Sequence, residues 1–309
     1  MVITGATAGI GRATARRFAE QGARIGLVAR GLDGLGATRI EVEALGGEAL
    51  LLPCDVANPD EVNEAARLVI AAWGGIDVWV NNATVSVFSP VRQMTPHDFT
   101  RVTQVSYLGA VYGTLAALAN MLPRDRGVIV QVSAASAHHG VPLQSANAAA
   151  KHALLGFTES LRAELLHDGS HVHVTTVEPQ ATNTPQFDWL KNRMARQARP
   201  APPIYQPEVA AEAIYHAALH PRPHGLTDVL RARTGYRPQQ LQLDDPADPR
   251  QPSNLWAPVR GDHGAHGRFD RDARKGSLQV WAAMHRGAVS AGVAALVAMS
   301  WLGFRWTRG

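Results

Sequence analysis

Short apolar runs alternate with segments of helical periodicity from residue 1 to about residue 220. Such alternation is typical of strand–helix units that build a parallel sheet covered by helices on both faces. The predicted strands are residues 2–4, 24–29, 49–54, 76–80, 128–132 and 171–177. The pattern therefore predicts an α/β fold with a doubly wound parallel sheet over residues 1–220.

Polar residues predict where the helices between these strands begin. Asn58 is placed as an N-cap, with Pro59 at the first helical position and Glu61 at the third, an order that satisfies the free amides of a first turn. A second helix is expected to start after Thr95, and another to cover residues 145–167. The strand that precedes the first helix begins almost at Met1, so we expect a short first strand.

The alternation ends near residue 220. Residues 221–276 are rich in Pro, Asp, Arg, His and Gly without a sustained apolar period, which predicts an irregular or disordered linker. Residues 277–309 are predicted to hold an apolar helix, because the run from Gly287 to Phe304 contains 18 residues without a charge. That length just suffices for a membrane span. A membrane anchor and a helix that packs on the protein or on a partner are both open.

Composition narrows the class of function. The net charge is +4 and the 30 basic residues are scattered along the chain, so we expect no nucleic-acid interface. Cys54 is the single cysteine, which excludes an internal disulfide and any multi-cysteine metal site, and no metal site is predicted. No charged or apolar leader follows Met1, so the prediction is a cytoplasmic protein, with anchoring by the C-terminus as the alternative.

A glycine-rich turn lies between the first predicted strand and the helix that follows it. The segment from Thr4 to Gly11 reads TGATAGIG, with glycines at positions 5, 9 and 11. Glycines there allow a tight turn and a close approach of backbone amides to a pyrophosphate at the helix N-terminus. We expect dinucleotide contacts from Thr4, Gly5, Gly9, Ile10 and Gly11, although a purely structural turn would have the same form.

The end of the second strand indicates which dinucleotide is preferred. An acidic residue about 20 positions after the glycines would select NAD by meeting the ribose hydroxyls. Arg30 stands at the strand end instead, where its guanidinium can pair with the 2′-phosphate of NADP. Arg12 is a second candidate for that contact. NADP is therefore predicted, with NAD less favoured, unless Arg30 is an ordinary surface arginine.

Together these features resemble the short-chain dehydrogenase/reductase family, of the classical type, over residues 1–220. The glycine spacing Thr-Gly-x-x-x-Gly-x-Gly is the family's fingerprint. Three further segments are similar to family motifs: Asp55-Val56, which resembles an adenine contact; Asn81-Asn82-Ala83, with Thr84 in place of a glycine; and Pro179 with Thr184, near the nicotinamide. The resemblance implies a Rossmann-like fold and cofactor contacts at these positions.

The resemblance also implies hydride transfer between a nicotinamide and a carbonyl or alcohol carbon. In the family a tyrosine passes the proton, a lysine four residues later supports it, a serine polarises the substrate oxygen and an asparagine completes a proton relay. Lys151 matches the lysine, but Asn147 stands at the tyrosine position, Ala134 at the serine position and Ser106 at the asparagine position. An amide does not exchange protons near neutral pH, and a methyl group does not bind an oxyanion.

Nearby polar residues are imperfect substitutes for the missing groups. Ser133 is one residue away from the serine position, which on a strand predicts the opposite face. His138 and His139 lie in the following loop and are alternative proton donors, or ordinary loop histidines. Phe187 and Trp189 fall where the family has its substrate loop and suggest a hydrophobic substrate, although an exposed linker is equally expected.

Two functions are therefore compatible with the sequence. One is an oxidoreductase that transfers hydride between NADP(H) and an unidentified carbonyl or alcohol substrate with an altered proton donor. The other is a catalytically degenerate NADP(H)-binding protein that acts as a sensor, scaffold or partner subunit. A decayed gene product is a third reading, and the sequence leaves the oligomeric state open.

Overall fold

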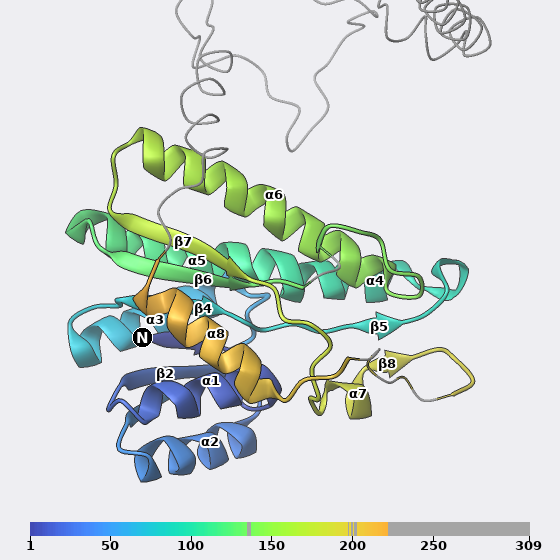
Figure 1. The fold of residues 1–309 in the computed structure, drawn as a ribbon, viewed down its shortest axis with the longest axis horizontal. Helices are drawn as coiled ribbons and strands as arrows, with labels where there is room; N and C mark the ends of the chain where they lie inside the picture. The colour runs from blue at the N-terminus through green and yellow to red at the C-terminus, as the bar shows by residue number, and fades with distance from the viewer. Residues whose placement is uncertain (135–136, 197, 199, 201–202, 222–309) are drawn as a thin grey trace, which may run out of the picture. The chain divides into compact units, whose positions relative to one another are not determined.

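The structure is a computed structural model that describes residues 1–134, 137–196, 198, 200 and 203–221 (Figure 1). The predicted linker, apart from Pro221, and the predicted C-terminal helix with its run from Gly287 to Phe304 lie outside the described residues. The domain boundaries near residues 220 and 276 therefore stay predictions.

The elements alternate between strands and helices along the chain. In order they are β1 (Val2–Thr4), α1 (Gly9–Ala19), β2 (Arg24–Ala29), α2 (Leu32–Ala44), β3 (Glu48–Pro53), α3 (Pro59–Trp73), β4 (Val78–Asn81), β5 (Val87–Phe88), the 3₁₀ turn η1 (Val91–Gln93), α4 (Pro96–Thr103), the π-helical turn η2 (Gln104–Leu108), α5 (Gly109–Met121), the 3₁₀ turn η3 (Leu122–Arg124), β6 (Gly127–Val132), α6 (Ser145–His167), β7 (Val172–Val177), α7 (Gln186–Trp189), β8 (Lys191–Asn192) and α8 (Pro207–Leu219).

Six strands form a parallel sheet in the order β3-β2-β1-β4-β6-β7. The chain starts in the middle of this sheet and winds outward in both directions, so the order reverses between β1 and β4. This confirms the doubly wound, Rossmann-like fold that the sequence predicts. Ligands of such sheets bind beyond the carboxyl ends of the strands at the point of reversal. As expected, β1 is short, yet it pairs with a neighbour on each side.

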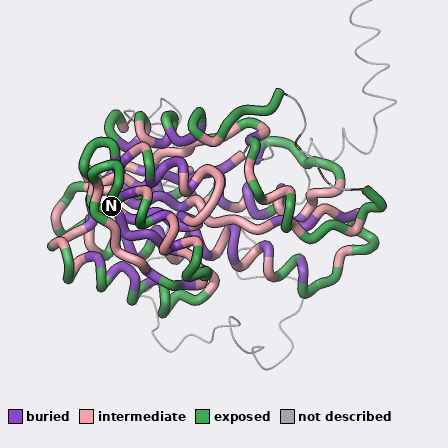
Figure 2. The backbone as a smooth tube through the Cα atoms, turned by 90° about the horizontal axis from the view of Figure 1, so that it is seen from below, coloured by how far each residue is buried: buried purple, intermediate pink, exposed green. Residues whose placement is uncertain are grey.

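Helices cover both faces of the sheet and bury two apolar clusters. On one face Phe18 of α1 and Ile214 of α8 pack with Leu27 and Val80 of the strands. On the other face helices α3, α5 and α6 pack on strand residues that include Trp79. Figure 2 shows the buried positions gathered along the middle of the described chain, with exposed positions around them. The strands are apolar on both sides because both sides are covered.

The predicted helix starts are confirmed by their capping contacts. The Asn58 side chain accepts a hydrogen bond from the backbone N–H of Asp60 at 3.1 Å, and Glu61 accepts one from the Asn58 side chain at 2.8 Å. Thr95 caps α4 by accepting from the N–H of Asp98 at 3.1 Å. Each such cap stabilises its helix by about 1 kcal/mol.

One continuous helical run among the described residues is long and apolar enough to span a membrane. It covers Pro96–Arg124, and 56% of its most apolar 18-residue stretch is buried inside the protein. Its residues Ala117 and Met121 are fully buried against the sheet. The run is therefore a core helix, interrupted by the π-helical turn η2, which contains Ser106. Such turns often mark functional sites.

Candidate active site

A cavity of about 1390 Å³ lies at the carboxyl ends of the strands, with walls from the segments that follow β1, β2, β3, β4, β6 and β7. It brings together residues that the sequence predicts for the cofactor, namely Gly5, Gly9, Ile10, Arg30, Asp55, Val56, Ala83, Lys151, Pro179 and Thr184. Ala134 and Asn147, at the substituted catalytic positions, line the same cavity. One cavity thus joins the predicted cofactor and catalytic positions.

The glycine turn has the geometry of an anion site. Gly5 and Gly9 adopt positive φ angles of 67° and 52°, which side chains disfavour. A Cβ atom on Gly11 would lie 2.1 Å from the carbonyl oxygen of Gly5, so the helix can approach the turn this closely only without a side chain. At the N-terminus of α1, Ala8 offers no side-chain cap and the first turn has no acidic residue. Backbone N–H groups there are suited to hold a phosphate.

Thr4 and Asn81 do not line the cavity but hold residues next to it. The Thr4 hydroxyl accepts hydrogen bonds from the N–H groups of Asn82 at 2.9 Å and Ala83 at 3.0 Å. The Asn81 side chain is buried and contacts Trp79 and Gln131 at 2.8 and 3.1 Å. Both residues therefore position their neighbours, and so does Gly11, which is also absent from the lining.

Asn82 and Ala83 of this motif line the cavity, whereas the prediction named Asn81 and Ala83 as the cofactor residues. Its side-chain amide donates to the carbonyl oxygens of Thr4 at 3.0 Å and Gly5 at 3.2 Å, which fastens the end of β4 to the glycine turn. Strand alternation was the available signal, because Asn81 is the last residue of a strand and points into the core.

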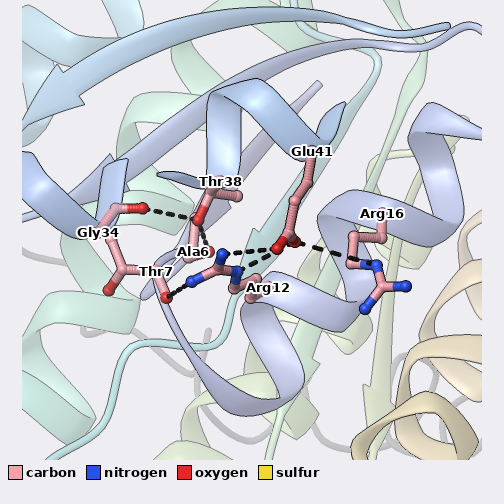
Figure 3. A network of polar contacts seen from close by, with 7 residues as sticks. All are labelled: Ala6, Thr7, Arg12, Arg16, Gly34, Thr38 and Glu41. Atoms are coloured by element: carbon pink, nitrogen blue, oxygen red, sulfur yellow. Dashed lines mark hydrogen bonds and ion pairs between the residues drawn. The ribbon is translucent and has the colours of Figure 1, made fainter. Parts of the chain in front are cut away.

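Arg12 is drawn away from the cavity by Glu41 of α2. Its guanidinium donates to both carboxylate oxygens of Glu41, at 2.6 and 3.1 Å, and to the carbonyl oxygen of Thr7 (Figure 3). Arg16 adds a longer ion pair of 4.0 Å to the same carboxylate. These cations hold the pKa of Glu41 below its usual range. Arg12 is not among the residues that line the cavity, and its charge is balanced within this network.

Arg30 and Asp55 flank the other end of the same region. Arg30 is exposed, lines the cavity and has no ion pair within the described part of the chain. Asp55 accepts from the N–H of Ala57 at 3.1 Å and from the Arg101 guanidinium at 2.6 Å. Burial would raise the pKa of Asp55, but these two contacts keep it below its usual range. Arg101 also lines the cavity, and the sequence carried no signal for it because it comes from a distant helix.

Lys151 of α6 lines the same cavity, near Asn147 in the sequence. Its side chain is buried, and its Nζ donates to the carbonyl oxygen of Val132 at 2.8 Å. Burial lowers the pKa of Lys151 to about 8. Asn147 lies one helical turn earlier on α6, half-buried, and its side chain has no hydrogen bond with any residue that the structure describes.

Ser133 and Ala134 both line the cavity, since they follow Val132, the last residue of β6, where the regular strand ends. The N–H of Ser133 donates to the carbonyl oxygen of Val177 at 2.8 Å. Its Oγ is buried and has no hydrogen-bond partner in the described structure, so the hydroxyl is not exposed to the cavity, in keeping with the opposite face that alternation predicts.

Ser106, at the family's asparagine position, closes a polar contact behind the cavity wall. Its Oγ lies 3.0 Å from Oγ1 of Thr84 and bonds to both the N–H and the carbonyl oxygen of Val85 at 3.1 Å. Ser106 therefore fixes the segment after β4 and does not itself line the cavity.

The alternative donors His138 and His139 do not line the cavity. His138 is exposed, and its Nε2 lies 2.9 Å from a carboxylate oxygen of Glu178. The structure therefore places neither histidine where a substrate carbonyl would meet Lys151.

The cavity mouth is apolar and is fastened by an ion-pair clamp. Phe187 and Trp189 of α7 line it, and Trp189 exposes 64% of its surface. Just beyond, β8 pairs with β5 as a second, two-stranded parallel sheet.

The clamp is formed by Asp98 of α4, Lys191 and Arg193. The buried Asp98 carboxylate accepts from Lys191 at 2.6 Å and from Arg193 at 2.5 Å. These two cations hold the pKa of Asp98 far below its usual range. The clamp joins two segments that are 93 residues apart in the sequence, at the cavity wall that contains Asp98 and Lys191, and no local sequence pattern predicted it.

Comparisons with known proteins agree with this geometry. The family model described as short chain dehydrogenase matches residues 1–194. The chain is 34% identical over 299 residues to an uncharacterized oxidoreductase, YxnA, of Bacillus subtilis (strain 168), which covers 90% of this chain and 82% of that protein. That match extends beyond residue 220.

Two solved structures are similar to the described fold. A metagenomic short-chain oxidoreductase in complex with NADP has a TM-score of 0.59 and 30% identity, covering 71% of this chain and 89% of that one. NAD⁺-bound xylitol dehydrogenase has a TM-score of 0.57 and 30% identity, covering 59% and 70%. Similar folds therefore accompany both cofactors.

Proposed function

Because the chain belongs to the short-chain dehydrogenase family, we propose that it is an NADP(H)-dependent oxidoreductase that acts on an apolar carbonyl or alcohol with an altered proton donor. The single observation that carries this proposal is the shared cavity, in which the phosphate-binding turn and Lys151 face the same space. Bound NADPH would supply a hydride to the substrate carbon.

The residues of the cavity fit this cofactor. The open N–H groups at the start of α1 suit the pyrophosphate, and Asp55 suits the adenosine end. Arg30, without an ion pair among the described residues, favours a 2′-phosphate, whereas the charge of Arg12 is already balanced by Glu41. Preference for NADP over NAD rests on Arg30, since related structures hold either cofactor.

The substrate class follows from the mouth of the cavity. Phe88, Val141, Phe187, Trp189 and Leu190 contribute apolar surface there. A hydrophobic carbonyl or alcohol would gain free energy by covering this surface, at about 25 cal/mol per Å² buried.

A second candidate function is favoured by Asn147 and Ala134. If no other side chain takes over the roles of the family's tyrosine and serine, the protein binds NADP(H) without turnover and serves as a sensor, scaffold or partner subunit. The same cavity would then hold the cofactor without turnover.

One experiment separates the two functions. NADPH binding by calorimetry and NADPH-dependent reduction of a series of straight-chain aldehydes are measured on the same purified protein. Binding with turnover supports the oxidoreductase, whereas binding without turnover across the series supports the degenerate protein. Absence of binding contradicts both.

We also propose, from the sequence alone, that the run from Gly287 to Phe304 associates with membranes. Its support is the uncharged apolar composition between Arg286 and Arg305. Apolar substrates that dissolve in lipid would be accessible to a protein held at that surface.

A further inference from the structure

We propose that Lys151 is itself the proton donor for carbonyl reduction in this protein, in place of a tyrosine at position 147. The inference rests on the proposed oxidoreductase function and deepens it. Three observations carry it: the position of Lys151 in the cavity, the bonding of its Nζ and the state of the other ionisable groups around it.

The Lys151 ammonium has protons available to the cavity. Its side chain is 5% exposed and lines the cavity, and one of its three N–H groups is used by the carbonyl oxygen of Val132 at 2.8 Å. It forms no ion pair with any described residue. Two N–H groups therefore remain for ligands.

The other charged side chains of the cavity are unsuited to this role. Asp55 is paired with Arg101, and Asp98 is paired with Lys191 at the mouth. The guanidinium of Arg30 does not release its proton at physiological pH.

The elements packed against α6 add no better donor. The titratable and charged side chains of α6, α4, η2 and β7 other than Lys151 are His152, Glu159, Arg162, Glu164, His167, His97, Asp98, Arg101, Tyr107 and His173. Of these, Asp98 and Arg101 share the cavity with Lys151, and both are ion-paired. Within the described residues, Lys151 is thus the cavity's unpaired ammonium.

The burial that isolates Lys151 also makes it a suitable acid. Removing an ammonium from water disfavours its charged form, and the pKa of Lys151 falls to about 8. A general acid works best when its pKa is near the working pH, because it is still protonated yet releases its proton readily. An ordinary surface lysine would be a much weaker acid.

The step balances with the groups present. As hydride reaches the carbonyl carbon from NADPH, which is oxidised to NADP⁺, the carbonyl π electrons move to the oxygen. An N–H bond of Lys151 breaks and the O–H bond of the alcohol forms. Lys151 is left as a neutral amine and regains a proton from water before the next turnover.

Asn147 has a positioning role in this arrangement. Its side-chain amide, one turn before Lys151 and free of hydrogen bonds to described residues, can donate to the substrate oxygen but does not release a proton. The substitution of tyrosine by asparagine thus retains a hydrogen-bond donor while leaving the proton to the lysine.

The first test measures Lys151 directly, without turnover. The chain has three lysines, Lys151, Lys191 and Lys275, so carbon-13 labelling at lysine Cε gives three resonances. Lys191→Arg and Lys275→Arg each remove one resonance, and the resonance that remains in both variants belongs to Lys151. In the protein without bound cofactor we expect Lys151 to titrate near pH 8 rather than near 10.5. Titration near 10.5 would overturn the proposal.

The second test uses NADPH-dependent reduction of decanal. The value of kcat/KM should fall with a single ionisation above the midpoint found by NMR. Lys151→Arg keeps the positive charge but withholds the proton, so kcat should fall about 10²-fold or more, while calorimetry still detects NADPH binding. Lys275→Arg, outside the described residues, is the matched control and should leave the rate unchanged.

The outcomes separate the two levels of inference. The assignment of Lys151 is overturned if Lys151→Arg reduces decanal as fast as the unaltered protein, or if the rate does not change with the ionisation of Lys151. Either result is still compatible with the oxidoreductase function. NADPH binding without reduction of decanal or of the other straight-chain aldehydes by the unaltered protein overturns the proposed function and this assignment with it.

Discussion

The hydroxyl oxygens of Thr84 and Ser106 lie 3.0 Å apart, and both residues stand where the family has other residue types. By resemblance, Ser106 stands at an asparagine position of the family and Thr84 at a glycine position. The two hydroxyls bond to each other, and Ser106 also bonds to the backbone of Val85, so these contacts hold the segment after β4 against η2.

This pair should be energetically coupled. Thr84→Val and Ser106→Ala should each lower the free energy of unfolding by about 1–2 kcal/mol, and the double variant should lose less than the sum by about 0.5–1 kcal/mol. Urea unfolding, monitored by tryptophan fluorescence, measures the free energy of unfolding of each single variant and of the double variant. Thr103→Val is the control, because the Thr103 hydroxyl donates to the Phe99 carbonyl at a more exposed site. If the losses of Thr84→Val and Ser106→Ala simply add in the double variant, the two hydroxyls do not bond to each other.

Arg30 should determine the preference for NADPH. Arg30→Ala should weaken NADPH binding about 10- to 100-fold and leave NADH binding nearly unchanged, because only NADPH carries the 2′-phosphate. Calorimetry with both cofactors checks this. Arg39→Ala on α2, whose side chain pairs with Glu43, is the matched control. Equal affinity of the unaltered protein for both cofactors would remove the argument from Arg30.

Restoring the family's catalytic residues should raise turnover. We expect the unaltered protein to reduce carbonyls at least about 10³-fold more slowly than relatives with tyrosine and serine, since both a general acid and an oxyanion donor are changed. Asn147→Tyr combined with Ala134→Ser should recover much of this rate, because Lys151 already lies one turn from position 147.

Steady-state kinetics with decanal compares the double variant with each single variant. Gln144→Tyr, also on the cavity wall, is a control for the mere addition of a phenol. A fast unaltered protein would contradict the expectation that its catalytic site is impaired.

The Asp98 clamp should persist well into the acidic range. The pKa of Asp98 is depressed in the folded protein, so its stabilising contribution is complete above the pKa of a free carboxyl group and is lost only as the pH falls through the lower, folded value. Asp98→Asn removes both ion pairs at any pH.

In Asp98→Asn, amide hydrogen exchange at Lys191 and Asn192 should become several-fold faster, and KM for decanal should rise. Asp77→Asn is the control, because Asp77 is exposed and pairs with Arg124 away from the cavity. If amide hydrogen exchange in β8 is the same in Asp98→Asn as in the unaltered protein, the pairing of β8 with β5 holds this segment in place without the ion pairs.

The C-terminal run should direct the protein to membranes. The full chain should sediment with liposomes or require detergent, and a chain ending at Lys275 should stay in the supernatant. Full-length protein that remains in the high-speed supernatant without detergent would contradict the anchor.

Local patterns were sufficient for the sheet but not for side-chain partners. Apolar runs and caps located every strand of the main sheet to within about two residues, and α6 at 145–167, because period and capping are local properties. The pairing of Arg12 with Glu41 could not be predicted from such patterns, since the two residues are 29 positions apart. The same holds for Arg101 and for the Asp98 clamp, whose contacts exist only after the sheet has assembled.

The cavity divides between two groups of segments. Residues 5–56 form the wall after β1, β2 and β3, whereas the wall after β4 and β7 holds Phe187 and Trp189 together with the predicted cofactor residues Ala83, Pro179 and Thr184. The clamp ties those later segments to each other rather than to residues 5–56. The two walls can therefore be varied separately: a graft of residues 186–196 from a relative should change substrate choice and leave cofactor binding in place, provided that the partners of Asp98 are kept.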